Sequence, residues 1–176
     1  VRRVWIPKPG SDEKRPLGIP VMEDRARQAL VKMALEPEWE AKFEPNNYGF
    51  RPRRSCHDAI QAIFMNIKLA PKYVLDADIA KCFDRINHEA LLAKLGTFPE
   101  LRRVIKAWLQ AGIVDAGELF PTSEGTPQGG VISPLLMNVA LHGFATAIEE
   151  NFQKYKCLPT GAFRWKPVVI RYADDF

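Results

Sequence analysis

The amino-acid sequence predicts an α+β fold in which strands and helices are interspersed without a regular alternation. Two observations support this prediction. Segments typical of strands are joined by short polar loops, as in hairpins, and segments with apolar residues at helical spacing lie between them. No strand–helix–strand unit recurs along the 176 residues, so a parallel sheet with regular crossovers is not expected.

The N-terminal part of the chain predicts a hairpin followed by two helices. Residues 2–20 form two apolar segments around a polar loop, which is typical of a β-hairpin. A helix is expected from about Asp24, and a loop over 44–54 follows it. Ser55 and Asp58 form a capping-box pattern that opens the next helix. The residues expected on the buried faces are Ala26, Ala29, Leu30, Met33 and Ala34, and then Ile60, Ile63, Phe64 and Ile67.

The rest of the chain predicts further strands and helices. Residues 72–79 have the composition of a strand, and Asn87 can cap a helix that buries Leu91, Leu92 and Leu95. The remaining expected elements are a helix over 99–110, a hairpin over 112–125, a long helix from Ser133 and a final strand over 167–172.

Composition and charge are those of an ordinary globular chain. The net charge is +4, which fits a polyanionic partner without requiring one. Cys56, Cys82 and Cys157 are scattered and odd in number, so a reducing, intracellular (cytoplasmic) compartment is expected rather than disulfides or a zinc site. No apolar run is long enough to span a membrane, and no membrane partner is expected.

Carboxylates follow two of the expected strands. Asp174 and Asp175 come directly after the last one, and Asp78 lies at the end of an earlier one. Adjacent carboxylates repel each other, and a divalent cation with hard oxygen ligands, such as Mg²⁺ or Mn²⁺, offsets that repulsion. Carboxylates that converge from two strands can hold two ions and support in-line phosphoryl transfer. An Asp pair is also common in β-turns, and Asp76 and Asp84 are alternative acids nearby.

Two further patterns suit contact with a nucleotide. Phe83 is either a core aromatic or a planar wall beneath a sugar, where a 2′-hydroxyl would collide. Gln128 and Gly129 lie in a glycine-rich turn ahead of a helix start at Ser133. Exposed backbone N–H groups in such a turn suit a phosphate or the edge of a base and sugar. An ordinary turn explains the glycines but gives Gln128 no role.

Basic residues gather in two places in the first third of the chain. Lys8 and Arg15 lie in the expected hairpin, and Arg51 lies in a proline-flanked loop. A hairpin with these charges can fold over a triphosphate, and Arg51 can clamp a template backbone or a phosphate. Solvated surface charge is the alternative interpretation for each cluster.

Several segments of the chain, taken in order, resemble those of reverse transcriptases, and most closely those of the group II intron-encoded (maturase) type. The segments are residues 15–20 (RPLGIP), 48–52 (YGFRP), 76–86 (DADIAKCFDRI), 125–135 (GTPQGGVISPL) and 171–176 (RYADDF). Each is a weak pattern alone, but their occurrence together in this order is specific. The resemblance covers almost the whole chain.

This resemblance implies the fold of a right-hand polymerase. Fingers are expected over 1–70 and a palm over 71–176, with an antiparallel palm sheet packed by helices. The chain is expected to be a piece of a longer protein, truncated after residues 172–176 (YADDF) and without the thumb. Because the thumb grips the primer and template in this family, the piece alone is expected to be inactive.

The resemblance also implies roles for single residues. Asp78, Asp174 and Asp175 match the metal-binding acids, with the Ile79 carbonyl as an additional ligand. Phe83 matches the aromatic residue that excludes ribonucleotides. Gln128, with Gly129, matches the residue beside the incoming nucleotide, and Lys8, Arg15 and Arg51 match finger residues that touch phosphates or template.

The implied function is RNA-directed DNA polymerisation with Mg²⁺ or Mn²⁺, in which a dNTP extends a DNA or RNA primer on an RNA template. A member of this family also binds intron RNA, aids splicing and retromobility of its mobile element, and works within a ribonucleoprotein. Two alternatives remain: a non-enzymatic RNA-binding maturase scaffold, and a reverse transcriptase of the retron or diversity-generating type. The sequence leaves open which RNA is bound, whether a homodimer forms, and which of the two metals is used.

Overall fold

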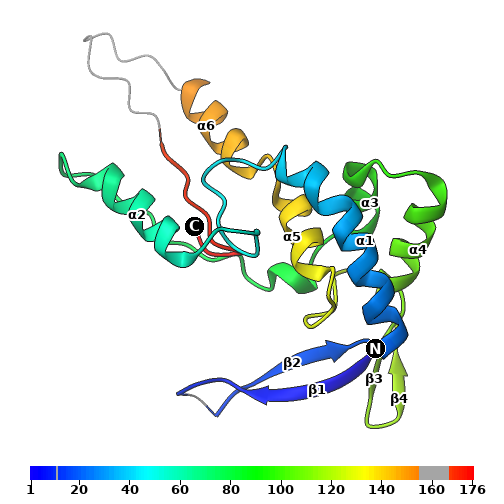
Figure 1. Cartoon of the computed structure of the whole chain (residues 1–176). Coiled ribbons are helices and arrows are strands. Elements are labelled where there is room, and N and C mark those ends of the chain that lie inside the picture. Colours follow the sequence, from blue (N-terminus) through cyan, green and yellow to red (C-terminus); the bar gives the residue numbers. More distant parts are fainter. Residues whose placement is uncertain (11, 155–166) are drawn as a thin grey trace. The chain divides into compact units, whose positions relative to one another are not determined.

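The computed structural model describes residues 1–10, 12–154 and 167–176 (Figure 1). Cys157 therefore lies outside the described residues, whereas Cys56 is an exposed free cysteine and Cys82 a buried one. Within the described part of the chain, no helix combines the length and the apolar character that crossing a membrane requires.

The chain forms two compact units, each built from two separate stretches of sequence. The first unit comprises residues 1–41 and 80–140, and the second comprises residues 42–79 and 141–176. Segments that are distant in the sequence are therefore neighbours within each unit. The division into fingers over 1–70 and palm from 71 onward stays a prediction.

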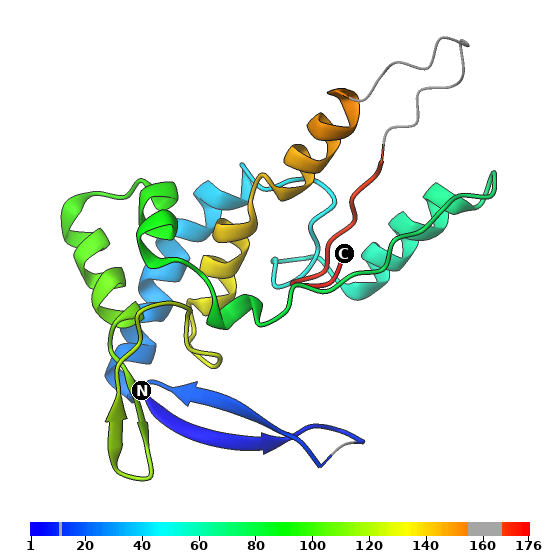
Figure 2. The same ribbon diagram turned by 180° about the vertical axis from the view of Figure 1, so that it is seen from behind.

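Strands β1 to β4 of the first unit form a four-stranded mixed sheet in the order β2-β1-β3-β4 (Figure 2). Their bounds are β1 Arg2–Pro7, β2 Lys14–Ile19, β3 Ile113–Asp115 and β4 Glu118–Phe120. The antiparallel β1–β2 pair, in which Trp5 lies opposite Pro16, confirms the first predicted hairpin. The antiparallel β3–β4 pair confirms the second. One parallel contact, between Arg2 and Val114, joins the two hairpins.

Helices that pack on one another form the interior of the first unit. The helical elements are α1 Met22–Glu40, the 3₁₀ turn η1 Cys82–Asp84, α3 His88–Leu95, α4 Pro99–Leu109 and α5 Ser133–Leu141. Their largest fully buried apolar side chains are those of Leu91, Leu92, Ile105, Leu109, Leu136, Met137 and Val139. The predicted cap of α3 is confirmed, since the Asn87 side-chain oxygen accepts from the Ala90 N–H at 2.9 Å.

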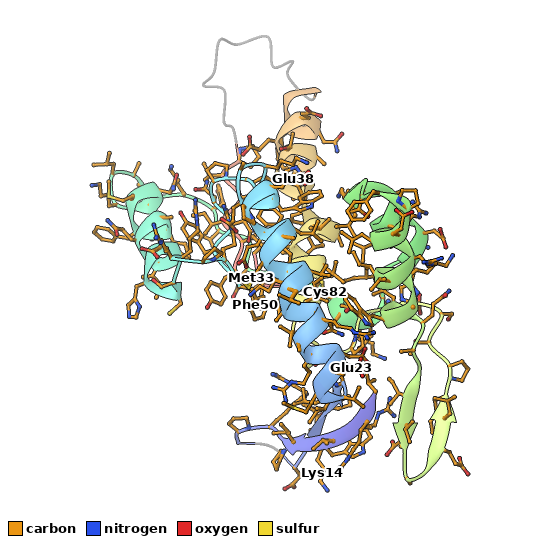
Figure 3. All side chains as sticks on the ribbon, turned by 45° about the vertical axis from the view of Figure 1, so that its right-hand side comes forward. Lys14, Glu23, Met33, Glu38, Phe50 and Cys82 are labelled. Atoms are coloured by element: carbon orange, nitrogen blue, oxygen red, sulfur yellow. The ribbon has the colours of Figure 1, made fainter. Side chains whose placement is uncertain are left out.

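The buried face of α1 differs from the predicted one. Leu30 and Met33 are each 69% exposed, and Figure 3 labels Met33 on the ribbon of α1. The buried side chains of α1 are those of Gln28, Leu35 and Trp39. The Gln28 side-chain oxygen accepts from the Val131 N–H at 2.9 Å, so a polar residue with a partner lies inward while two apolar residues lie outward. Helical spacing was therefore predicted correctly, but the buried face was not.

The second unit contains α2, Cys56–Ile67, and α6, Phe144–Lys154. The predicted capping box of α2 is confirmed, because Ser55 and Asp58 bond reciprocally through side chain and backbone. The predicted buried face of α2 is wrong, because Ile60 and Phe64 are 61% and 58% exposed and Ala59 is the one residue of α2 that is buried. Apolar residues at helical spacing predict an amphipathic helix, but they do not show whether another element packs against its apolar face.

The strands expected over 72–79 and 167–172 do not form ladders in the structure. Their described residues take part in isolated bridges, which are Asp78 with Asp175, Tyr172 with Asp175, and Asn47 with Arg171. Tyr73, Val74 and Leu75 are exposed. A strand needs a hydrogen-bonded neighbour, and the bridges supply one only around the acids. The observed sheet is the mixed one of the first unit, and the antiparallel palm sheet stays a prediction.

The long helix expected from Ser133 is interrupted. Helix α5 ends at Leu141 and α6 begins at Phe144. Gly143, between them, has a φ of 88°, a backbone conformation that a continuing right-handed helix cannot adopt. Gly143 therefore ends the helix that was expected to continue from Ser133.

Candidate active site

Acids that are far apart in the sequence meet at one point of the second unit. Asp78 and Asp175 face each other in an isolated antiparallel bridge, and Asp174 precedes Asp175 in the chain. Ala77 and Phe176 exchange two backbone hydrogen bonds of 2.9 Å each, which fixes this register. Asp78 and Asp175 are therefore a pair without mutual hydrogen bonds, whose side chains share one face, and in such pairs the Cα atoms lie about 4.5 Å apart.

A tight turn presents Asp174 and Asp175. The Tyr172 N–H donates to the Asp175 carbonyl at 2.9 Å, and the Asp175 N–H donates back to the Tyr172 carbonyl at 3.2 Å. Ala173, the first of the two residues in the turn, has a φ of 60°. A positive φ at this position matches the right-handed twist of the flanking strands, and it disfavours most residues other than glycine.

Partial burial, together with the negative charges of neighbouring carboxylates, raises the pKa of Asp175. Partial desolvation of its carboxyl group is the larger cause, and the negative charges of Asp174, Asp78 and Asp76 add to it. The side chain is exposed to solvent, so screening keeps the effect small. Asp174, Asp78 and Asp76 are thus close enough for their charges to act on the carboxyl group of Asp175.

The chemistry of these acids fits a divalent cation. Carboxylate oxygens are the ligands that Mg²⁺ prefers, and a cation would relieve the repulsion that raises the pKa of Asp175. Ile79 lies beside them, because its N–H donates to the Asp174 carbonyl at 3.2 Å. Within the described residues, however, no three His, Cys, Asp or Glu side chains already converge as a ready ligand set. The backbone thus brings the acids together, and their metal binding stays a proposal.

Phe83, Gln128 and Gly129 lie in the first unit. Phe83 is part of η1 and is neither fully buried nor fully exposed. Its carbonyl accepts from the Thr126 N–H at 2.7 Å, so the glycine-rich turn is attached to η1. On its other side the turn meets β2, because the Gly18 N–H donates to the Gln128 carbonyl at 2.6 Å. The turn therefore lies between two elements that fix its backbone.

A cavity of about 250 Å³ opens beside this turn in the first unit. Gly18, Asp84, Thr126 and Gln128 are among the residues that line it, and Arg3 adds a cationic group. The Arg3 guanidinium also pairs with Asp115 at 3.2 Å. Gln128 therefore lies at a concave surface that both polar and apolar residues line.

The basic residues differ in their surroundings. Lys8 forms an exposed ion pair with Glu13 across the β1–β2 hairpin, and Arg15 is exposed on β2. Arg51 is only 7% exposed, and its guanidinium donates to the carbonyl oxygens of Glu44 and Asn47, each at 3.0 Å. A contact of these three cations with phosphate or template stays a prediction.

Sequence reasoning missed two residues beside the acids. Arg171 is 2% exposed, and its guanidinium donates to the Ala173 carbonyl at 2.7 Å. Gly49 lies against Ala173 so closely that a Cβ atom would be 2.1 Å from the Ala173 nitrogen. Both residues lie inside motifs that were noticed, but only the folded chain shows which backbone atoms they touch.

Comparison with known proteins places these observations in a family. A family described as reverse transcriptase (RNA-dependent DNA polymerase) matches residues 6–176, and the chain belongs to this family. The match runs through both units and includes each of the acids and the glycine-rich turn.

Similarity to individual proteins narrows the class to the group II intron type, which confirms the resemblance found in the motifs. The chain is 39% identical to the group II intron-encoded protein LtrA of Lactococcus lactis subsp. cremoris, over 81% of the chain and 24% of LtrA. It is 37% identical to protein YkfC of Escherichia coli (strain K12), over 99% of the chain and 52% of YkfC. The chain thus spans about half the length of YkfC and about a quarter of LtrA.

Proposed function

We propose that this chain carries the polymerase site of an RNA-directed DNA polymerase, which adds dNTPs to the 3′-hydroxyl of a primer on an RNA template. The observation that supports the proposal most strongly is the pairing of Asp78 with Asp175, which brings acids from distant segments onto one face. Family membership supports the same reaction.

In the proposed step, the primer 3′-oxygen bonds to the α-phosphorus of the dNTP while the bond from that phosphorus to the bridging oxygen breaks. Pyrophosphate leaves with that bonding electron pair, and the hydroxyl proton passes to solvent. Mg²⁺ is the proposed cofactor, with Mn²⁺ as a substitute, and when bound it acidifies the hydroxyl and neutralises charge on the leaving group. Asp78, Asp174 and Asp175 would hold it, with the Ile79 carbonyl as a further ligand.

Further residues would select and hold the nucleotide. The partly exposed ring of Phe83 suits a wall beneath a deoxyribose, where a 2′-hydroxyl would collide. Gln128 and Gly129, in a turn whose backbone is fixed on both sides, suit contact with the sugar and phosphates. Lys8, Arg15 and Arg51 would contribute charge toward phosphates or template.

Primer extension on an RNA template tests this proposal, using the protein that contains the chain. Asp78→Asn, Asp174→Asn and Asp175→Asn are each expected to lower kcat/KM by about 10³-fold or more. The three acids are proposed to hold the metal together, so the loss of one of them removes most of the catalytic effect of all three. Asp24→Asn, at the start of α1, is the matched control and should leave extension unchanged. Wild-type extension by the three site variants would refute the proposal.

A second function, assistance to the folding or splicing of intron RNA, is supported by the similarity to LtrA, whose name describes a group II intron-encoded protein. Exposed cations such as Arg15 suit binding to a polyanion and do not involve the carboxylates. The same Asp→Asn variants separate the two functions. Splicing assistance that survives in variants without DNA synthesis would show that both functions exist and are independent.

A further inference from the structure

The turn that presents Asp174 and Asp175 is held by a loop from a distant part of the sequence, within the second unit. The Arg171 N–H donates to the Asn46 carbonyl, and the Tyr48 N–H donates to the Arg171 carbonyl, each at 2.9 Å. These two bonds make a parallel bridge between Asn47 and Arg171, and both of those residues are almost fully buried. The loop over 44–51 is therefore attached to the residue that leads into the turn.

The Arg171 side chain makes a second connection to the turn. Its guanidinium, within a side chain that is 2% exposed, donates to the Ala173 carbonyl at 2.7 Å. Burial of a guanidinium has a large desolvation cost, and the hydrogen bond to the Ala173 carbonyl offsets part of it. The acceptor is the carbonyl of the residue with a φ of 60°, directly before Asp174. This bond favours the unusual backbone conformation that aims the acids.

Gly49 makes the third connection, by close contact. A Cβ atom on residue 49 would lie 2.1 Å from the Ala173 nitrogen and 2.8 Å from its Cα. Both are backbone atoms, so no side-chain rotation could relieve the clash, and either the loop or the turn would have to shift. The loop itself is braced, since Arg51 donates to the carbonyl oxygens of Glu44 and Asn47.

We propose that Gly49 and Arg171 are positioning residues that set the direction of Asp174 and Asp175 toward Asp78. This inference rests on the proposed function, because it assumes that the three acids bind a cation together. A displacement of a reacting group by about 1 Å can lower a rate about 10²-fold, so small shifts of this turn have large effects. The loop thus acts on the reaction through the turn, without touching substrate.

The test measures cation binding directly, in the protein that contains the chain. Tb³⁺ prefers oxygen ligands, and excitation of Tyr172, next to the acids, sensitises the emission of a Tb³⁺ ion bound there. Competition by Mg²⁺ identifies binding at that site. Gly49→Ala and Arg171→Met are each expected to weaken Tb³⁺ binding about tenfold and to lower kcat about 10²-fold, with an unchanged KM for dNTP.

Gly96→Ala is the matched control. Gly96 follows α3 in the first unit with a φ of 60°, so this variant should lose stability but keep its Tb³⁺ affinity and kcat. Arg171→Met provides a second route if Gly49→Ala does not fold, because an apolar chain of similar length can fill a buried site without leaving a charge. Folding of each variant is checked by its melting temperature.

Each outcome decides one of the two hypotheses. Folded variants that bind Tb³⁺ with wild-type affinity would overturn the positioning role, even if their melting temperatures fall. A wild-type protein that makes no DNA, yet binds Tb³⁺ in a way that Gly49→Ala weakens, would refute the proposed function and leave the positioning role in place.

Discussion

The interiors of the two units contain different kinds of contact. The first unit has a mainly apolar interior in which Leu92, Ile105, Met137 and Val139 are completely buried, beside a few buried polar residues such as Asn138. The most buried side chains of the second include Asn47 and Arg171, and Arg51 is nearly as buried. Apolar residues of α2 in the second unit are instead exposed.

Because of this difference, the residues that stabilise the fold are expected to differ from the residues that orient the candidate site. Buried apolar area stabilises a fold without regard to direction, whereas buried polar groups require particular partners at particular angles. The unit that holds the carboxylates uses the second kind of contact around them. Such contacts add little net stability, but they fix the orientation of the groups that they hold. The comparison thus predicts where substitutions cost stability and where they cost function.

The largest expected effect on stability is in the interior of the first unit. Leu92→Ala should lower the free energy of unfolding by about 2–5 kcal/mol, because Leu92 is fully buried and its loss leaves a cavity. Phe64→Ala on α2 removes more atoms, yet it should change stability by less than about 0.5 kcal/mol, because that ring is 58% exposed. Urea unfolding followed by circular dichroism measures both. If Phe64→Ala lowered the free energy of unfolding as much as Leu92→Ala does, the proposed difference between the two units would be wrong.

An intermediate effect is expected at the helix caps, which provide a matched pair across the two units. Ser55→Ala removes the cap of α2 and Asn87→Ala removes the cap of α3, and each should cost about 1 kcal/mol. Amide hydrogen exchange shows where the loss occurs. Each variant should speed exchange mainly in its own helix. Equal acceleration of both helices by either variant would show that the units unfold as one.

The smallest expected effect is at a surface ion pair of the first unit. The hydrogen bond and charge of Lys106, and then the charge of Arg102, lower the pKa of Glu89 below its usual 4.5. Because the folded pKa is the lower one, the stabilisation is present above pH 4.5 and is lost as the pH falls through the folded value. Glu89→Gln should thus lower the melting temperature slightly at pH 7, and by less and less as the pH falls below 4.5.

High salt serves as the control for the Glu89 prediction. Since Glu89 is exposed, 1 M NaCl should remove most of the difference between the wild type and Glu89→Gln, because the Debye length falls to about 3 Å at that concentration. A difference that persists in high salt, or that does not shrink as the pH falls below 4.5, would mean that Glu89 acts through packing rather than charge.

Local signals in the sequence predicted the elements that depend on near neighbours. The Ser55 and Asn87 caps are confirmed because each side chain bonds a backbone N–H three residues ahead. Both hairpins of the first unit are confirmed for a similar reason, since strands joined by a short loop have little choice of partner. Predictions of burial were less successful, as Leu30 of α1 and Phe64 of α2 show.

By itself, the sequence determined the order of the motifs, the helix starts and the identity of the acids, because these depend on residues within a few positions of one another. Only the tertiary structure decided that Asp78 pairs with Asp175, and that Gly49 and Arg171 contact the turn that carries Asp174 and Asp175. Contacts between distant segments depend on the packing of the whole unit. Two backbone segments can come close only where no side chain lies in the way. A glycine or an arginine within a motif does not reveal which atoms it will touch.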